Sequence, residues 1–145
     1  MIPMFLLDTN VVSELRQGKP SRNEHVLAWA SRQDVAMLYL SSVAVFELEI
    51  GVRTMERKDV LQGRSLRAWW SQVFEAFEER ILPFSAVTAM GCAPLHVPDK
   101  RPYRDSMMAA TALEHGFTLV TRNISDFQIP GLKLLNPWQH TPVDR

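Results

Sequence analysis

The chain has 145 residues, of which 46% are hydrophobic and 22% charged, with 16 basic and 16 acidic side chains. This length and composition suit one compact domain with a hydrophobic core. Zero net charge excludes nucleic-acid binding through a wholly basic surface, so any such binding requires a local patch or a metal ion. No apolar run approaches the ~20 residues that span a bilayer. Cys92 is the only cysteine, which excludes an intrachain disulfide, and we expect a cytoplasmic protein that does not bind membranes.

The first half of the chain alternates short apolar runs with helical stretches. Met4–Leu7 is a continuous apolar run that ends at Asp8, which predicts a buried strand followed by a helix cap. The elements that we predict after it are helices over Val11–Arg16 and Glu24–Arg32, a strand over Val35–Leu40, and helices over Val43–Met55 and Val60–Glu79.

The second half continues the alternation. We predict in order a strand over Ile81–Phe84, a helix from Ser85 to about Leu95, a basic loop over Pro98–Arg104, a helix over Asp105–His115, and strands over Phe117–Val120 and Lys133–Leu135. Gly116 is a suitable left-handed helix stop. This order predicts an α/β fold of three layers, α/β/α, with a central, mostly parallel sheet of about five strands. We expect a single domain over residues 1–139 and a flexible tail over 140–145.

Four acidic residues are placed to meet at one edge of this sheet. Ligand sites in open parallel sheets lie outside the carboxyl ends of the strands. Asp8 directly follows the first predicted strand, and Asp126 comes shortly after the fourth. Glu47 lies one turn into the helix after the second strand, and Asp105 begins the helix that leads into the fourth. Each aspartate also has an ordinary explanation: a helix cap for Asp8, a helix-dipole partner for Asp105 and a turn residue for Asp126.

Glu47 is harder to explain as a surface residue. Its neighbours three and four positions away on the predicted helix are all apolar or small, so we expect the carboxylate to be buried and to need a partner. Glu49 differs, because Arg53 lies one helical turn further on and can pair with it at the surface.

Four carboxylates in one cleft would repel each other and raise each other's pKa. A divalent cation such as Mg²⁺ relieves this repulsion, because it prefers oxygen ligands. A cation held in this way polarises a phosphodiester and supplies hydroxide for in-line attack. The sequence therefore predicts metal-dependent phosphodiester hydrolysis.

Several blocks of the chain, in this order and spacing, are similar to the PIN-domain ribonucleases, in particular the VapC- and FitB-like toxins of bacterial type II toxin–antitoxin modules. Some members of this group are plasmid stability proteins. The resemblance covers nearly the whole chain. The blocks are Leu6–Glu14, Ser42–Gly51, Asp105–Ala112, Leu119–Phe127 and Asn136–Trp138.

The resemblance assigns roles to the acids and to their neighbours. It implies that Asp8, Glu47, Asp105 and Asp126 form the catalytic acidic quartet, with Asp8 and Asp105 as the direct ligands of Mg²⁺ or Mn²⁺. The polar neighbours that it implicates are Asn10 and Thr121, which would orient acids or waters, and Arg122, which would face a phosphate or serve the structure. It further implies RNA cleavage, a homodimer, and a cognate antitoxin that blocks the acidic cleft and mediates any contact with operator DNA.

The segment before Asp105 is more charged than this resemblance leads us to expect. Asp99 is a competing candidate ligand, and Arg104 either binds substrate or neutralises the site. Lys100, Arg101 and Arg104 together are our preferred group for binding RNA phosphates. The basic residues near the start of the long helix are better explained as a solvated face. Of the adjacent Trp69 and Trp70, we expect that one faces a protein partner.

Two alternatives to a ribonuclease remain open. The chain could be a regulatory subunit that acts through an antitoxin complex on DNA, with little nuclease activity. A phosphorylation receiver domain would need a lysine after the last strand, whereas Lys133 comes too early. Cys92 and His96 are spaced as a metal pair on a helix, but no second pair completes a zinc site.

Overall fold

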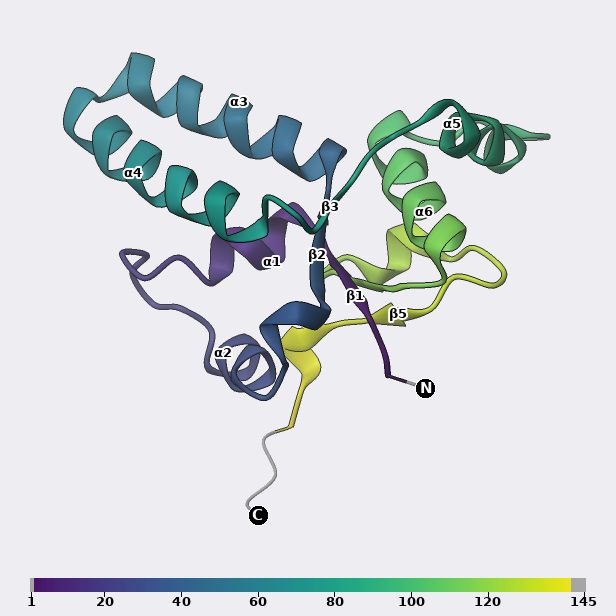
Figure 1. Ribbon diagram of the computed structural model, residues 1–145, viewed down its shortest axis with the longest axis horizontal. Coiled ribbons are helices and arrows are strands. Elements are labelled where there is room, and N and C mark those ends of the chain that lie inside the picture. Colours follow the sequence, from purple (N-terminus) through teal and green to yellow (C-terminus); the bar gives the residue numbers. More distant parts are fainter. Residues whose placement is uncertain (1, 142–145) are drawn as a thin grey trace.

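A computed structural model describes residues 2–141 of the chain (Figure 1). Its centre is a five-stranded sheet in the order β3-β2-β1-β4-β5, in which all paired strands are parallel. The strands are β1 (Phe5–Leu7), β2 (Leu38–Ser41), β3 (Ile81–Leu82), β4 (Thr118–Val120) and β5 (Leu134–Leu135). The predicted three-layer fold with a parallel sheet of about five strands is confirmed.

Helices cover both faces of the sheet. The α-helices are α1 (Thr9–Glu14), α2 (Glu24–Ser31), α3 (Ser42–Lys58), α4 (Val60–Phe77), α5 (Ala86–Cys92) and α6 (Tyr103–His115). The short 3₁₀ helices are η1 (Val35–Met37), η2 (Ala93–His96), η3 (Ile124–Phe127) and η4 (Pro137–Gln139). Within residues 2–141, no helix is long and apolar enough to cross a membrane.

The alternation of side chains along β1 divides the core into two clusters. Phe5 and Leu7 face one cluster, which receives α1, α2 and the packed faces of α3 and α4. Leu6 faces the opposite cluster, which is filled mainly by α6 and η3. Both faces of this central strand are therefore buried, as its continuous apolar sequence predicts.

Helices α3 and α4 form a hairpin that projects from the sheet (Figure 1). Asp59 separates them and caps α4, because its side chain accepts hydrogen bonds from the amides of Leu61 and Gln62. The helices approach closely at Gly63, where an added Cβ would lie 2.5 Å from the Cα of Glu56. Only glycine fits there without moving one of the two backbones.

Several predicted boundaries are wrong for local reasons. The strand expected over Val35–Leu40 begins only at Leu38, because Asp34 caps the 3₁₀ turn η1 that precedes it. The helix expected to reach about Leu95 becomes 3₁₀ from Ala93, next to Pro94. The first helix begins and ends two residues before the predicted bounds.

The start of α6 matters most for the site. This helix begins at Tyr103, two residues before the predicted start at Asp105. Arg104, predicted in the preceding loop, and Asp105 therefore both lie in the first helical turn.

The predicted tail over 140–145 lies largely outside the described part of the chain, which ends at residue 141. The carbonyl oxygen of His140 accepts a hydrogen bond from His25 Nδ1 at 2.9 Å, which attaches that residue to α2.

Candidate functional site

The carboxyl ends of three neighbouring strands bring the site together. Asp8 follows the central strand β1, and its backbone amide continues the pairing with β4 by donating to the carbonyl of Val120 at 2.9 Å. The Asp8 side chain is fully buried. It also caps α1, because Oδ1 accepts from the amide of Thr9 at 2.6 Å. The helix cap expected at Asp8 is confirmed. The cap uses Oδ1, so Oδ2 of the same carboxylate can bind another group.

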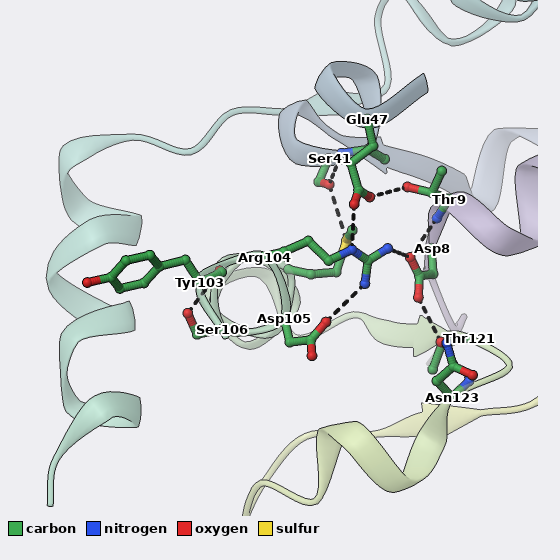
Figure 2. A network of polar contacts seen from close by, with 12 residues as sticks. Asp8, Thr9, Ser41, Glu47, Tyr103, Arg104, Asp105, Ser106, Thr121 and Asn123 are labelled. Atoms are coloured by element: carbon green, nitrogen blue, oxygen red, sulfur yellow. Dashed lines mark hydrogen bonds and ion pairs between the residues drawn. The ribbon is translucent and has the colours of Figure 1, made fainter. Parts of the chain in front are cut away.

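Both Asp8 oxygens have further partners (Figure 2). Oδ2 accepts a hydrogen bond from Thr121 Oγ1 at 2.7 Å, and the Asn123 amide in turn donates to Thr121 Oγ1 at 3.1 Å. Oδ1 accepts from Arg104 Nη2. Thr121 is itself fully buried. These contacts fix the orientation of the Asp8 carboxylate from the β4 side.

Glu47 reaches the same place from α3. Its Oε1 accepts a hydrogen bond from Thr9 Oγ1 at 2.5 Å, and its Oε2 accepts from Arg104 Nε at 2.7 Å. The expected need for a partner is confirmed. The expected burial is wrong, because the side chain is 28% exposed. Ile50 and Gly51, which were expected to cover this face of the helix, are exposed themselves.

Arg104 and Asp105 are adjacent in the first turn of α6. The guanidinium of Arg104 uses each of its three nitrogens on a different acid: Nη2 on Asp8, Nε on Glu47 and Nη1 on Asp105, the last at 3.1 Å (Figure 2). We call Asp8, Glu47 and Asp105 the carboxylate centre. Its members come from three segments that are far apart in the sequence, and Arg104 lies between them.

Charge in the carboxylate centre is unbalanced. Three carboxylates face one guanidinium, so formal charges leave an excess of two negative charges. Burial opposes the charged form of Arg104, but hydrogen bonds with Glu47 and Asp8 outweigh burial and raise the pKa of Arg104 above its usual range. The arginine therefore stays protonated and cannot by itself neutralise the three acids.

The first turn of α6 is anchored by His96, which the sequence suggested only as a metal partner of Cys92. His96 Nδ1 accepts from the amide of Arg101 at 3.3 Å, so the ring proton lies on Nε2 and points to Ser106 Oγ, 2.7 Å away. Ser106 Oγ donates in turn to the carbonyl of Tyr103 at 3.0 Å. Because Pro102 gives α6 no side-chain cap, this chain of bonds secures the turn that carries Arg104 and Asp105. No motif spacing would have revealed it.

Apart from Arg104 and Thr121, the side chains of the other predicted residues form no hydrogen bond or ion pair with the centre within residues 2–141. Asp126 is exposed in η3 at the same sheet edge, and no hydrogen bond or ion pair joins its side chain to the centre within the described residues. Asn10 Oδ1 is buried and has no partner among these residues. The exposed Arg122 stacks over the ring of Trp138 at 5.2 Å. Asp99 is exposed, and no described contact brings it to the carboxylates.

The donor chemistry of the site fits a hard divalent cation. Asp8, Glu47 and Asp105 offer carboxylate oxygens. Asn10, two residues after Asp8, has a buried amide oxygen without a hydrogen-bond partner among residues 2–141. In the present conformation, residues 2–141 contain no group of three acidic, histidine or cysteine side chains arranged to hold a metal ion. Arg104 occupies the position between the acids.

A second ionic cluster lies on the α3–α4 hairpin. Glu49 pairs with Arg53 at 2.6 Å as predicted, and it also receives two bonds from Arg67. Arg67 further binds Glu56, and Trp70 Nε1 donates to Glu49 at 3.0 Å. Partial burial raises the pKa of Glu49, but the stronger effect of the hydrogen bond from Arg67 lowers it to about 2. We call these residues the hairpin cluster.

Two further expectations concern side chains away from the centre. Cys92 is buried and His96 is bonded to Ser106, so the structure gives this pair a packing role. Trp70 is buried in the core cluster that contains Phe5 and Leu7, and the partly buried Trp69 packs against that cluster.

Comparison with known proteins gives consistent results. The PIN domain family matches residues 5–128. The chain is 38% identical to VapC ribonuclease Y4jK of Sinorhizobium fredii over 94% of this chain and 99% of that protein. It is 34% identical to toxin FitB of Neisseria gonorrhoeae, over 93% and 99%. A solved structure of FitAB bound to a DNA fragment superposes with a TM-score of 0.80 at 33% identity, over 95% of this chain and 98% of that chain. The resemblance noted in the sequence is confirmed, and the chain belongs to the PIN domain family.

Proposed function

We propose that this chain is a Mg²⁺- or Mn²⁺-dependent endoribonuclease and the toxin of a toxin–antitoxin pair. The observation that carries the proposal is the convergence of Asp8, Glu47 and Asp105 on one point from three distant segments. The ribonuclease name of the Sinorhizobium relative supports RNA as the substrate class.

The residues of the centre divide the work. Asp8 and Asp105 would hold the cation, with Glu47 and the exposed Asp126 completing the acidic quartet through water. A bound divalent cation supplies Lewis-acid activation of the phosphodiester and of the attacking water. Thr121 fixes one oxygen of Asp8 by its hydrogen bond, so the other oxygen stays directed into the centre.

Thr9 couples two of the acids. Its amide donates to Asp8 and its hydroxyl donates to Glu47, so the first residue of α1 sets the separation of these carboxylates. Arg122, held over Trp138 just after β4, follows Thr121 in the chain and would bind an RNA phosphate. Arg104 would bind a phosphate once it leaves the acids.

Cleavage by the purified chain tests this function. We expect RNA cleavage with Mg²⁺ or Mn²⁺, loss on addition of EDTA, and loss in the variant Asp8→Asn. Asparagine is also a good helix cap, so α1 should survive the change. Asp99→Asn is the matched control, because it removes an exposed acid that lies near the site in sequence. Full activity of Asp8→Asn in these conditions contradicts the mechanism.

A second candidate function is a regulatory subunit with little nuclease activity of its own. The solved FitAB structure contains DNA, which supports a protein partner that mediates contact with operator DNA. In both cases we propose a cognate antitoxin and a homodimer, in the cytoplasm. A chain that binds Mn²⁺ and retains operator binding in complex with a small basic partner, yet never cleaves RNA, would favour regulation.

A further inference from the structure

Arg104 takes the position that a cation bound by the acids would need. Its Nη2, Nε and Nη1 nitrogens bind Asp8 Oδ1, Glu47 Oε2 and Asp105 Oδ1 (Figure 2). The other oxygens of Asp8 and Glu47 are bound by the hydroxyls of Thr121 and Thr9. The oxygens directed into the centre are therefore the ones that the guanidinium uses.

A guanidinium and a metal ion cannot share these oxygens at close range. Mg²⁺ requires its ligand oxygens at about 2.0–2.1 Å in near-octahedral geometry. Arg104 holds the Glu47 and Asp105 oxygens at 2.7 and 3.1 Å from its own nitrogens, so it occupies the space between the acids. Both groups are also cations, and like charges at this distance repel.

We propose that Arg104 and the divalent cation occupy the carboxylate centre in turn, so that loading of the metal is an exchange in which the arginine side chain swings out. This inference rests on the proposed function and adds a means of regulation to the same site. In the metal-free protein Arg104 keeps the three acids together by partly offsetting their charge. The divalent cation then takes the place of the guanidinium and brings two positive charges instead of one.

The surroundings of Arg104 allow this movement. Its side chain is 32% exposed, so a path to solvent exists without unfolding α6. The backbone of the same turn stays fixed, because Ser106 and His96 tie it to η2 and to the loop before α6. Asp105 can thus remain at the centre while its neighbour leaves.

The alternative is that Arg104 is a permanent structural ion-pair partner. A permanent partner would support the metal site or leave it unaffected, and its removal would weaken or preserve metal binding. An exchanging partner competes with the metal, and its removal must strengthen metal binding. Tighter metal binding without Arg104 is thus the result expected of an exchange, and equal or weaker binding is the result expected of a permanent partner.

The test measures binding of Mn²⁺ alone, from the decrease of the free Mn²⁺ electron paramagnetic resonance signal, without RNA. We compare the wild type with Arg104→Gln and with the control Lys100→Gln, which removes one exposed positive charge from the loop before α6. We expect Arg104→Gln to bind Mn²⁺ tighter by on the order of tenfold, which corresponds to the loss of a competing charged contact. Lys100→Gln should change the affinity by less than about twofold, because an exposed charge is largely screened.

Equal or weaker Mn²⁺ binding by Arg104→Gln overturns the exchange. A second measurement covers the case in which this variant folds poorly. In wild-type protein, the ¹⁵N resonance of Arg104 Nε should shift on addition of Mg²⁺ as the contact with Glu47 is lost, and an unchanged resonance at saturating Mg²⁺ also overturns the proposal.

RNA cleavage in the same preparations separates this inference from the proposed function. Tighter Mn²⁺ binding by the variant with no cleavage by any form supports the exchange and contradicts the ribonuclease. RNA cleavage by the wild type together with unchanged Mn²⁺ affinity in Arg104→Gln supports the ribonuclease and contradicts the exchange. Failure of every form to bind Mn²⁺ contradicts both.

Discussion

Glu47 and Glu49 lie two residues apart on α3, and arginine binds both of them in different surroundings. In the hairpin cluster, Glu49 and Glu56 are matched by Arg53 and Arg67, all on two helices that are adjacent in sequence. In the carboxylate centre, three acids from distant segments face Arg104 alone.

Charge balance separates the two regions. In the hairpin cluster two acids are matched by two arginines, so no further ion is needed. These ion pairs hold α3 and α4 together. A surplus of acids assembled by the fold has no such explanation, since the repulsion costs stability. The difference supports the proposal that the carboxylate centre binds a further cation.

The largest loss of activity is expected when Glu47 is replaced by glutamine, with Glu49→Gln as the matched control. We expect Glu47→Gln to lower kcat/KM for RNA cleavage by at least about a hundredfold, because it removes a charge from the proposed metal site. Glu49→Gln, on the same helix, should stay within about twofold of the wild type. A fluorogenic RNA assay at saturating Mg²⁺ measures both. Similar losses in the two variants would remove the distinction between the regions.

A smaller loss is expected when the support of Asp8 is removed. Thr121→Val keeps the shape of the side chain but deletes the bond to Asp8 Oδ2. We expect kcat/KM to fall by about tenfold, the effect typical of residues that orient a metal ligand. Thr118→Val is the control, since its hydroxyl forms no side-chain hydrogen bond in residues 2–141. A Thr121→Val enzyme with wild-type activity would show that Asp8 needs no orientation from β4.

Removing the central arginine of the hairpin cluster should affect stability and leave activity unchanged. Arg67→Gln loses its bonds with Glu49 and Glu56, and we expect the free energy of unfolding to fall by about 1 kcal/mol. Arg53→Gln should have a smaller effect, because the Arg53 side chain is 73% exposed. Urea unfolding followed by tryptophan fluorescence measures both. A large loss of RNA cleavage in Arg67→Gln would mean that the two regions are coupled.

The smallest effect is expected on the stability of the protein at low pH. The pKa of Glu49 in the folded protein is about 2, below its ordinary value of 4.5. Its stabilising contribution is therefore complete above pH 4.5 and is lost as the pH falls toward 2. The difference in unfolding midpoint between the wild type and Glu49→Gln should shrink over this range. A difference that stays constant from pH 7 to pH 2 contradicts the assignment.

Much of the fold could be predicted because its signals are local. The apolar run before Asp8 and the helix stop at Gly116, which adopts φ 69°, depend on neighbouring residues only. The errors arose where a polar side chain or a proline changed a short segment. Asp34 turned the start of a predicted strand into 3₁₀ helix, and Pro94 ended the regular part of a helix.

The meeting of three of the four predicted acids could be predicted from the sequence, and their hydrogen-bond partners could not. Sequence order places Asp8, Glu47 and Asp105 at one sheet edge, and the contacts with Thr9 or Arg104 depend on side-chain geometry that no periodicity contains. The bond between His96 and Ser106 joins residues ten positions apart across a bend at Pro98 and Pro102, so helical spacing could not identify it. The charge surplus of the centre became visible only once these partners were counted.

The position of β1 between β2 and β4 has a consequence for the timing of assembly. The Asp8 amide pairs with Val120, and its carboxylate is oriented by Thr121, 113 residues later in the chain. During synthesis the Asp8 carboxylate therefore lacks its partner Thr121 until residues 118–121 have joined the sheet. Closing so long a loop is slow compared with forming helices, so the centre is completed late in folding. A nascent chain that ends before β4 carries three of the four predicted acids and cannot arrange Asp8 as the complete fold does.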